Sequence, residues 1–331
     1  MCYSLLTSIA SRLAVLGALF LLAACATNPV TGGQDIVLMS EEQEIALGKQ
    51  AHAQIVKQGE LYDAPELQAM VDRVGQKLAA QSHRSELNYT FSVLDSPDVN
   101  AFALPGGYVY ITRGIMAYLN SEEELAGVLG HEIGHVTARH SVQQQTAQTA
   151  SGLLGVLVGA ATGDANMVRA TNYASTALVQ GYGRSHELEE DRLGAQYLAR
   201  VNYNPESMLE VIGVLKDQEL FAQERAQASG EQAPAGYQGL FASHPDNDRR
   251  LQEVILAAGK YQSGDPEPVD LEAYLKSLDG MVFGDSEAQG IVRGNRFYHR
   301  SLNLYLAFPE GWRLINRPDR IIGVAPDEKQ V

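Results

Sequence analysis

Apolar residues recur every third or fourth position along much of this chain, a spacing that places them on one face of an α-helix. The stretch 66–80 shows this spacing, with Leu67 and Val71 among its apolar positions. Ser40 and Ser121 are each followed three residues later by Gln or Glu, the capping-box pattern that begins a helix. The predicted helices, in chain order, are one that begins after Ser40, then 66–80, Ser121 to about His140, 184–201, 205–226 and 248–258.

Strands are predicted where apolar and polar residues alternate or where β-branched and aromatic residues cluster. Residues 89–94 alternate in this way, and 108–111 form a second strand after the turn at Pro105-Gly106-Gly107. Beyond Gly290 the pattern changes to short strands separated by Gly, Asn and Ser. These strands lie at 291–292, 296–299 and 302–308. The pattern therefore predicts an α+β protein, a mainly helical domain with a small β-sheet followed by a small C-terminal β unit.

The segment 151–162 is rich in Gly, Ala and Leu, and its pattern allows three interpretations. It could form a buried helix, a flexible lid or a segment that touches a membrane, and its composition favours the buried helix. After it, the chain is expected to complete a main domain at 36–261, continue through a linker at 262–290 and end in the β unit at 291–331. That unit ends without an obvious closing strand, which leaves its completeness open.

The composition excludes several functional classes. The chain has 331 residues, of which 45% are hydrophobic and 20% charged, so disorder throughout is excluded. A net charge of −15 argues against nucleic-acid binding, which requires a basic face. The two cysteines, Cys2 and Cys25, cannot build a disulfide framework or a cysteine-based zinc site.

The first 25 residues predict where the protein is located. An apolar run at 13–24 follows Arg12; it has the length of a signal-peptide core and is too short to span a membrane. It ends in Leu-Ala-Ala before Cys25, which resembles a bacterial lipobox and implies cleavage after residue 24 and lipidation of Cys25. The alternative is an ordinary signal peptide with an incidental cysteine. We expect a signal peptide at 1–24 and a lipidated tether at 25–35. The lipid would anchor the protein in the cell envelope of a Gram-negative bacterium. Ala26 and not Asp stands directly after Cys25, a pattern typical of sorting to the outer membrane, so we expect the protein at the periplasmic face of that membrane.

The most specific chemical signal is His131-Glu132-Ile133-Gly134-His135. On a helix, histidines four positions apart share one face, so both imidazoles can bind one metal ion. Glu132 lies next to that face, where it can reach a metal-bound water. The alternative is an exposed helix with two unrelated histidines, but apolar flanking residues place the motif in a folded, amphipathic helix.

A catalytic zinc site needs a third protein ligand from another element. The predicted helix 184–201 offers Glu187, Glu189, Glu190 and Asp191. Glu187 and Asp191 are four positions apart and share a face. This suits Glu187 as a metal ligand and Asp191 as a hydrogen-bond partner of a ligating imidazole. The alternative for each acid is a position on a solvent-exposed helix face.

Three separate stretches, 130–140, 184–191 and 101–107, together resemble the M48 family of zinc metallopeptidases. The resemblance covers about 28–258 and is strongest for lipid-anchored or periplasmic members that act in outer-membrane quality control. A stress-activated member of the mitochondrial inner membrane is a more distant likeness. The second motif of the family usually has Ala at the position of Glu190 in this sequence.

The resemblance implies a mainly helical zincin-like fold and a zinc metalloendopeptidase. One Zn²⁺ ion per chain would be held by His131, His135 and Glu187. Glu132 would act as general base on the zinc-bound water and then deliver the proton to the leaving amine. Asp191 is the other residue implied in catalysis.

Further expectations concern a latency ligand, an oxyanion donor and a substrate-binding strand. In similar family members a loop histidine can occupy the open position of the zinc, which implies His244 as a latency ligand. His186 and Arg184 are candidates for a second oxyanion donor because they are near Glu187 in sequence. The residues 100–104 are expected to form an edge strand that pairs with an extended substrate backbone.

We therefore expect hydrolysis of misfolded or misassembled cell-envelope proteins. The expected partners are these substrates, a membrane through the lipid anchor and the outer-membrane assembly machinery, but no nucleic acid. One alternative is a chaperone-like assembly factor for outer-membrane proteins with a largely latent zinc site. Another is a zinc hydrolase that acts on a non-peptide bond.

Overall fold

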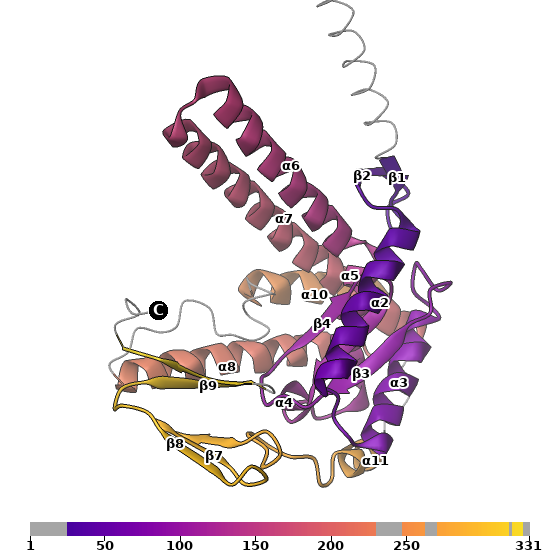
Figure 1. The fold of residues 1–331 in the computed structure, drawn as a ribbon. Coiled ribbons are helices and arrows are strands. Elements are labelled where there is room, and N and C mark those ends of the chain that lie inside the picture. The colour runs from indigo at the N-terminus through magenta and orange to yellow at the C-terminus, as the bar shows by residue number, and fades with distance from the viewer. Residues whose placement is uncertain (1–24, 230–246, 262–269, 318–319, 327–331) are drawn as a thin grey trace, which may run out of the picture.

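The computed structural model of the protein describes residues 25–229, 247–261, 270–317 and 320–326. Its helices are α2 (Glu41–Gln58), α3 (Pro65–Ala79), α4 (Arg113–Met116), α5 (Glu122–Thr137), α6 (His140–Thr162), α7 (Ala165–Arg200), α8 (Ser207–Ser229), α10 (Asn247–Tyr261) and α11 (Leu271–Ser277). Its strands are β1 (Cys25–Thr27), β2 (Gln34–Ile36), β3 (Thr90–Leu94), β4 (Ala101–Leu104), β5 (Tyr108–Thr112), β6 (Ile291–Arg293), β7 (Arg296–His299), β8 (Leu304–Ala307), β9 (Arg313–Arg317) and β10 (Arg320–Val324). Helices predominate over small sheets, which confirms the predicted fold class (Figure 1).

Both predicted capping serines begin helices. The Ser40 hydroxyl accepts a hydrogen bond from the Gln43 backbone at 3.3 Å, and the Gln43 side chain accepts one from the Ser40 backbone at 3.0 Å. At the start of α5 the Ser121 hydroxyl accepts from the Glu124 backbone at 3.1 Å. α5 then ends at Thr137 because Arg139 adopts a left-handed backbone, with φ of 59°, and the chain turns into α6.

A three-stranded sheet supports α5 from one side. Its strand order is β3-β5-β4, with β3 parallel and β4 antiparallel to β5. α3 and α5 pack on this sheet, and the core between them includes Phe91, Val109 and Leu129, each less than 3% exposed. β4 is the terminal strand of the sheet and also contacts α5, so a sheet edge lies beside the predicted motif helix.

Two glycines let α5 and α7 approach closely. A Cβ at Gly134 of α5 would lie 3.2 Å from the Glu190 Cα, and one at Gly194 of α7 would lie 3.2 Å from the His131 backbone nitrogen. Any larger residue at these points would push the helices apart, because interiors are close-packed. The small residues therefore bring the two predicted ligand-bearing helices together.

α6 and the first half of α7 form a helical hairpin that projects from the body of the protein (Figure 1). α7 starts at Ala165, far before the predicted start at 184, because packing against α6 stabilises a stretch that lacks a strong helical pattern of its own. The favoured interpretation of 151–162 as a buried helix is wrong. The segment is helical, but only Gly155 within it is buried, since its long apolar side chains lie on the outer faces of the hairpin.

Small β elements lie near both ends of the chain. The predicted tether forms a short hairpin, β1–β2, in which the Asn28 side chain accepts hydrogen bonds from the backbones of Val30 and Thr31 at 2.8 and 2.9 Å. At the other end, β6, β7 and β8 form an antiparallel sheet, and β9 pairs with β10. β9 and β10 were not predicted. Within the described ranges, each helix is too short or too polar to cross a membrane.

Candidate metal centre

Two histidines of α5 and a glutamate of α7 converge in the interior. The Nε2 atom of His131 lies 3.6 Å from one carboxylate oxygen of Glu187, and Nε2 of His135 lies 3.9 Å from the other. His131 and Glu187 are buried and His135 is partly buried. Glu190 joins them, and one ligand atom from each of these four residues falls within 4.8 Å of the others.

This donor set fits a zinc ion. Two imidazole nitrogens and a carboxylate oxygen are one of the known catalytic zinc ligand sets. Burial raises the pKa of the Glu187 carboxyl to about 7 in the absence of an ion, although the positive charge of nearby His131 opposes this rise. A divalent cation would favour the charged carboxylate and relieve the cost of burying it.

The other ring nitrogen of each histidine, Nδ1, contacts a carboxylate. The His131 Nδ1 atom lies 2.9 Å from Asp191 Oδ1, and the His135 Nδ1 atom contacts the Glu190 carboxylate. These contacts leave both Nε2 atoms facing Glu187. Such outer carboxylates fix the orientation and tautomer of ligating histidines.

Asp191 is itself held by Arg250 of α10. The Arg250 Nε atom donates to Asp191 Oδ2 at 2.8 Å, and Nη2 donates to Oδ1 at 2.9 Å. Burial alone would raise the pKa of Asp191, but the charge and hydrogen bonds of Arg250 outweigh it and lower that pKa to about 2. The carboxylate is therefore charged at neutral pH and ready to accept from His131.

Glu132 lies between the histidines in sequence and is 1% exposed. Its burial, with the negative charges of Glu190 and Glu187, raises its pKa well above the ordinary value, while a backbone hydrogen bond from Ala103 opposes the rise. That bond comes from β4, so the Glu132 carboxyl lies next to the sheet edge. A carboxyl with a raised pKa beside a metal site is suited to accept and return a proton.

The family model described as peptidase family M48 matches residues 65–256, which is more than half of the chain. The chain belongs to peptidase family M48. Family membership supports a metalloprotease, and the His/His/Glu/Glu cluster lies inside the matched region.

Relatives of this M48 chain carry descriptive names. The beta-barrel assembly-enhancing protease of Yersinia pestis is 28% identical over 225 residues, 65% of this chain and 44% of that protein. That of Escherichia coli K12 is 29% identical over 202 residues, 58% of this chain and 41% of that protein. The mitochondrial metalloendopeptidase OMA1 of Schizosaccharomyces pombe is 32% identical over 135 residues, 41% of this chain and 40% of that protein. The chain thus spans about two fifths of the length of these relatives.

Glu190 is the second glutamate in the cluster of this M48 site. The residue is completely buried, and its carboxylate contacts Nδ1 of both His135 and His140. His140 also lies 3.3 Å from Glu189 and stacks on His186 with ring centroids 3.7 Å apart. Burial alone would lower the pKa of His140, but the charges and hydrogen bonds of Glu190 and Glu189 together outweigh burial and raise that pKa to about 9. The acid is therefore paired with a protonated histidine.

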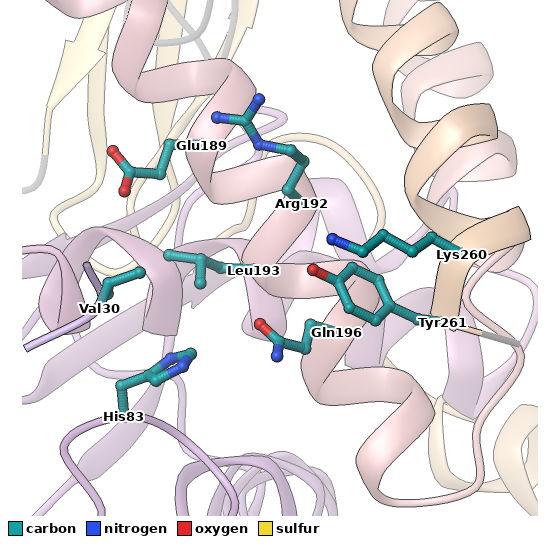
Figure 2. A pocket seen from close by; sticks show the side chains of 8 residues that line it. All are labelled: Val30, His83, Glu189, Arg192, Leu193, Gln196, Lys260 and Tyr261. Atoms are coloured by element: carbon teal, nitrogen blue, oxygen red, sulfur yellow. The ribbon is translucent and has the colours of Figure 1, made fainter. Parts of the chain in front are cut away.

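Two hollows lie near these helices in the M48 domain. One is small and borders His131, Glu132 and Arg250; its apolar lining comes from α5 and α8. The other has a volume of about 460 Å³ and is shown in Figure 2. It is lined on α7 by Glu189, Arg192, Leu193 and Gln196, which lie on the helix face opposite Glu187 and Asp191. The larger hollow is therefore separate from the metal centre.

The structure brings five of the predicted site residues together, namely His131, Glu132, His135, Glu187 and Asp191, and their roles in metal binding and catalysis stay predictions. His244 and the side chains of Cys25 and Arg184 lie outside the described residues, so their predicted roles stay predictions. The sequence reasoning missed the pairing of Arg250 with Asp191 and the bridging position of Glu190. The departure of Glu190 from the family motif was the signal for the second of these.

Proposed function

We propose that this M48 protein is a zinc-dependent endopeptidase in which His131, His135 and Glu187 hold one zinc ion. The observation that carries the proposal is the convergence of both Nε2 atoms on the Glu187 carboxylate, while acids occupy both Nδ1 atoms. A bound zinc ion supplies Lewis acidity toward water and the scissile carbonyl.

The protein's own residues would then handle the proton and the substrate. Glu132 takes a proton on its carboxylate from the attacking water and delivers it to the leaving amine nitrogen. Asp191 and Glu190 keep the two imidazoles oriented. The terminal strand β4 lies beside Glu132, so an extended substrate backbone can add to this sheet edge.

Main-chain pairing gives affinity with little sequence preference, which suits unfolded or misassembled proteins as substrates. The name of the bacterial relatives, beta-barrel assembly-enhancing protease, supports substrates in the cell envelope and contact with the outer-membrane assembly machinery. Residues 13–25 support an anchor at Cys25 in the outer membrane, on the periplasmic face.

Removal of the metal tests this proposal. A chelator is expected to abolish cleavage of an unfolded protein, and addition of one equivalent of Zn²⁺ is expected to restore it, because the buried ligand set cannot polarise water by itself. Zinc would be measured by elemental analysis and cleavage by gel electrophoresis. Cleavage that survives complete removal of zinc would refute a zinc mechanism.

A further inference from the structure

The α6–α7 hairpin presents an apolar, nearly uncharged tip to the surroundings. Its exposed residues, with the exposed fraction of each, are Leu153 at 60%, Leu154 at 49%, Val156 at 68%, Leu157 at 57% and Met167 at 51%. α6 contains no Asp, Glu, Lys or Arg, and residues 141–183 include only Asp164 and Arg169 as charged residues. The chain as a whole has a net charge of −15, so this tip differs sharply from it.

The base of the hairpin is tied to the segment that begins at Cys25. The Leu38 backbone donates to the Thr146 hydroxyl at 3.0 Å, and the Gln143 side chain donates to Asp35 at 3.0 Å. Cys25 pairs with Ile36 in the β1–β2 hairpin, and Ile36 is 63% exposed. In Figure 1, β1, β2 and the projecting hairpin lie at the same end of the protein.

We infer that the tip of the α6–α7 hairpin inserts into the interfacial region of a phospholipid bilayer. Protein interfaces usually combine an apolar centre with a polar rim, whereas this tip is a protruding arm with Asp164 and Arg169 as its only charged residues between positions 141 and 183. Near the base of the hairpin, Ile36 is a further exposed apolar residue. An anchor at Cys25 would hold this end against the membrane, and neither helix of the arm is apolar enough to span it.

Because the tip has almost no basic residues, the inferred insertion depends on apolar burial and not on anionic headgroups. It requires neither zinc nor catalysis, so its failure would leave the proposed peptidase function untouched. It predicts that the hairpin holds the metal centre near the membrane surface, where envelope substrates would be presented.

Uncharged phosphatidylcholine vesicles test this inference. The chain from residue 25 onward with Cys25→Ser keeps every described element and has no other thiol. It is expected to float with the vesicles, and the double substitution Val156→Asp and Leu157→Asp is expected to weaken this binding about tenfold or more. The matched control is Leu271→Asp with Leu275→Asp on α11, which are each 50% exposed and lie at the other end of the protein (Figure 1).

A label at Val156→Cys separates lipid from protein as the occupant. An environment-sensitive fluorophore there is expected to shift to the blue with vesicles and to be quenched by brominated lipid. Absence of flotation, or equal loss in both double substitutions, would overturn the inference. So would a label that responds to an unfolded polypeptide and not to vesicles, because the arm would then capture protein.

A second inference rests on Glu190, and it depends on the proposed zinc site. We infer that Glu190 is a positioning residue, whose carboxylate holds His135 through Nδ1 and also contacts Nδ1 of His140. Loss of such an outer partner typically lowers metal affinity by about 10–100-fold.

Competition with a fluorescent chelator measures this effect directly as zinc affinity. Glu190→Ala is expected to weaken zinc binding about tenfold or more, and Glu190→Gln, which can still accept from His135, is expected to recover most of it. Glu189→Ala is the matched control, because Glu189 contacts His140 but not His135 in the described structure. Unchanged zinc affinity in Glu190→Ala would refute the positioning role, whereas absence of zinc binding in the unaltered protein would refute the proposed function itself.

Discussion

Replacing Glu132 with glutamine is expected to abolish peptide hydrolysis while zinc stays bound. Glutamine has nearly the same volume but cannot accept the proton of the attacking water, and general acid–base groups contribute about 10²–10⁴-fold to the rate. Because Glu132 is not among the proposed ligands, His131, His135 and Glu187 should retain the metal. Cleavage of an unfolded protein and zinc content, measured on the same samples, check both expectations.

The matched control for this substitution is Glu123→Gln on the same helix. Glu123 accepts a hydrogen bond from the Asn204 backbone at 2.9 Å, and glutamine can accept the same bond. Hydrolysis by Glu132→Gln at a rate near that of the unaltered protein would exclude Glu132 as the general base. If Glu132→Gln restores outer-membrane assembly in a deletion strain, a chaperone-like role operates beside the peptidase.

Replacing Arg250 with methionine is expected to lower the free energy of unfolding by about 3–5 kcal/mol, because it leaves the Asp191 carboxylate buried and without its cation. Arg250 and Asp191 are both less than 5% exposed, so water cannot replace the lost partner. Urea unfolding followed by circular dichroism measures the change. It should be carried out with zinc and after chelation, because the pair contacts the metal centre.

Arg300→Met provides the comparison for this loss. Arg300 forms an ion pair with Glu287 at 2.9 Å, but both side chains are more than 60% exposed. Exposed pairs contribute about 0–1 kcal/mol, so little change is expected. Similar losses of free energy of unfolding for Arg250→Met and Arg300→Met would show that burial does not increase the contribution of the Arg250 pair to stability. Adding Asp191→Leu to Arg250→Met removes the unpaired buried carboxylate. If the double variant then loses less free energy of unfolding than Arg250→Met alone, the loss comes from that buried charge.

Local periodicity was sufficient to predict α5 and the shared face of its two histidines. Residues four positions apart lie on the same face of any α-helix, independently of the rest of the chain. The serine cap marked where α5 begins. The same rule paired Glu187 with Asp191 on α7. These are short-range consequences of helical geometry, so one sequence determines them.

The sequence could not decide between exposed and buried acids on α7. That choice depends on how α7 is rotated against α5, and the close approach at Gly134 and Gly194 sets this rotation. Nor could it assign Arg250 to Asp191, because the two are separated by 59 residues and meet only when α10 packs on α7.

In the segment 151–162, too, the sequence determined the composition and the tertiary structure determined the burial. Its sequence determined an apolar composition without charge, which is compatible with a core helix, a lid or a membrane contact. Only the tertiary structure placed it on a projecting hairpin, since burial depends on what packs against a helix and not on the helix alone. The sequence by itself thus determined which histidines and acids share a helical face, whereas long-range packing decided which acids enclose the site and which apolar surface stays exposed.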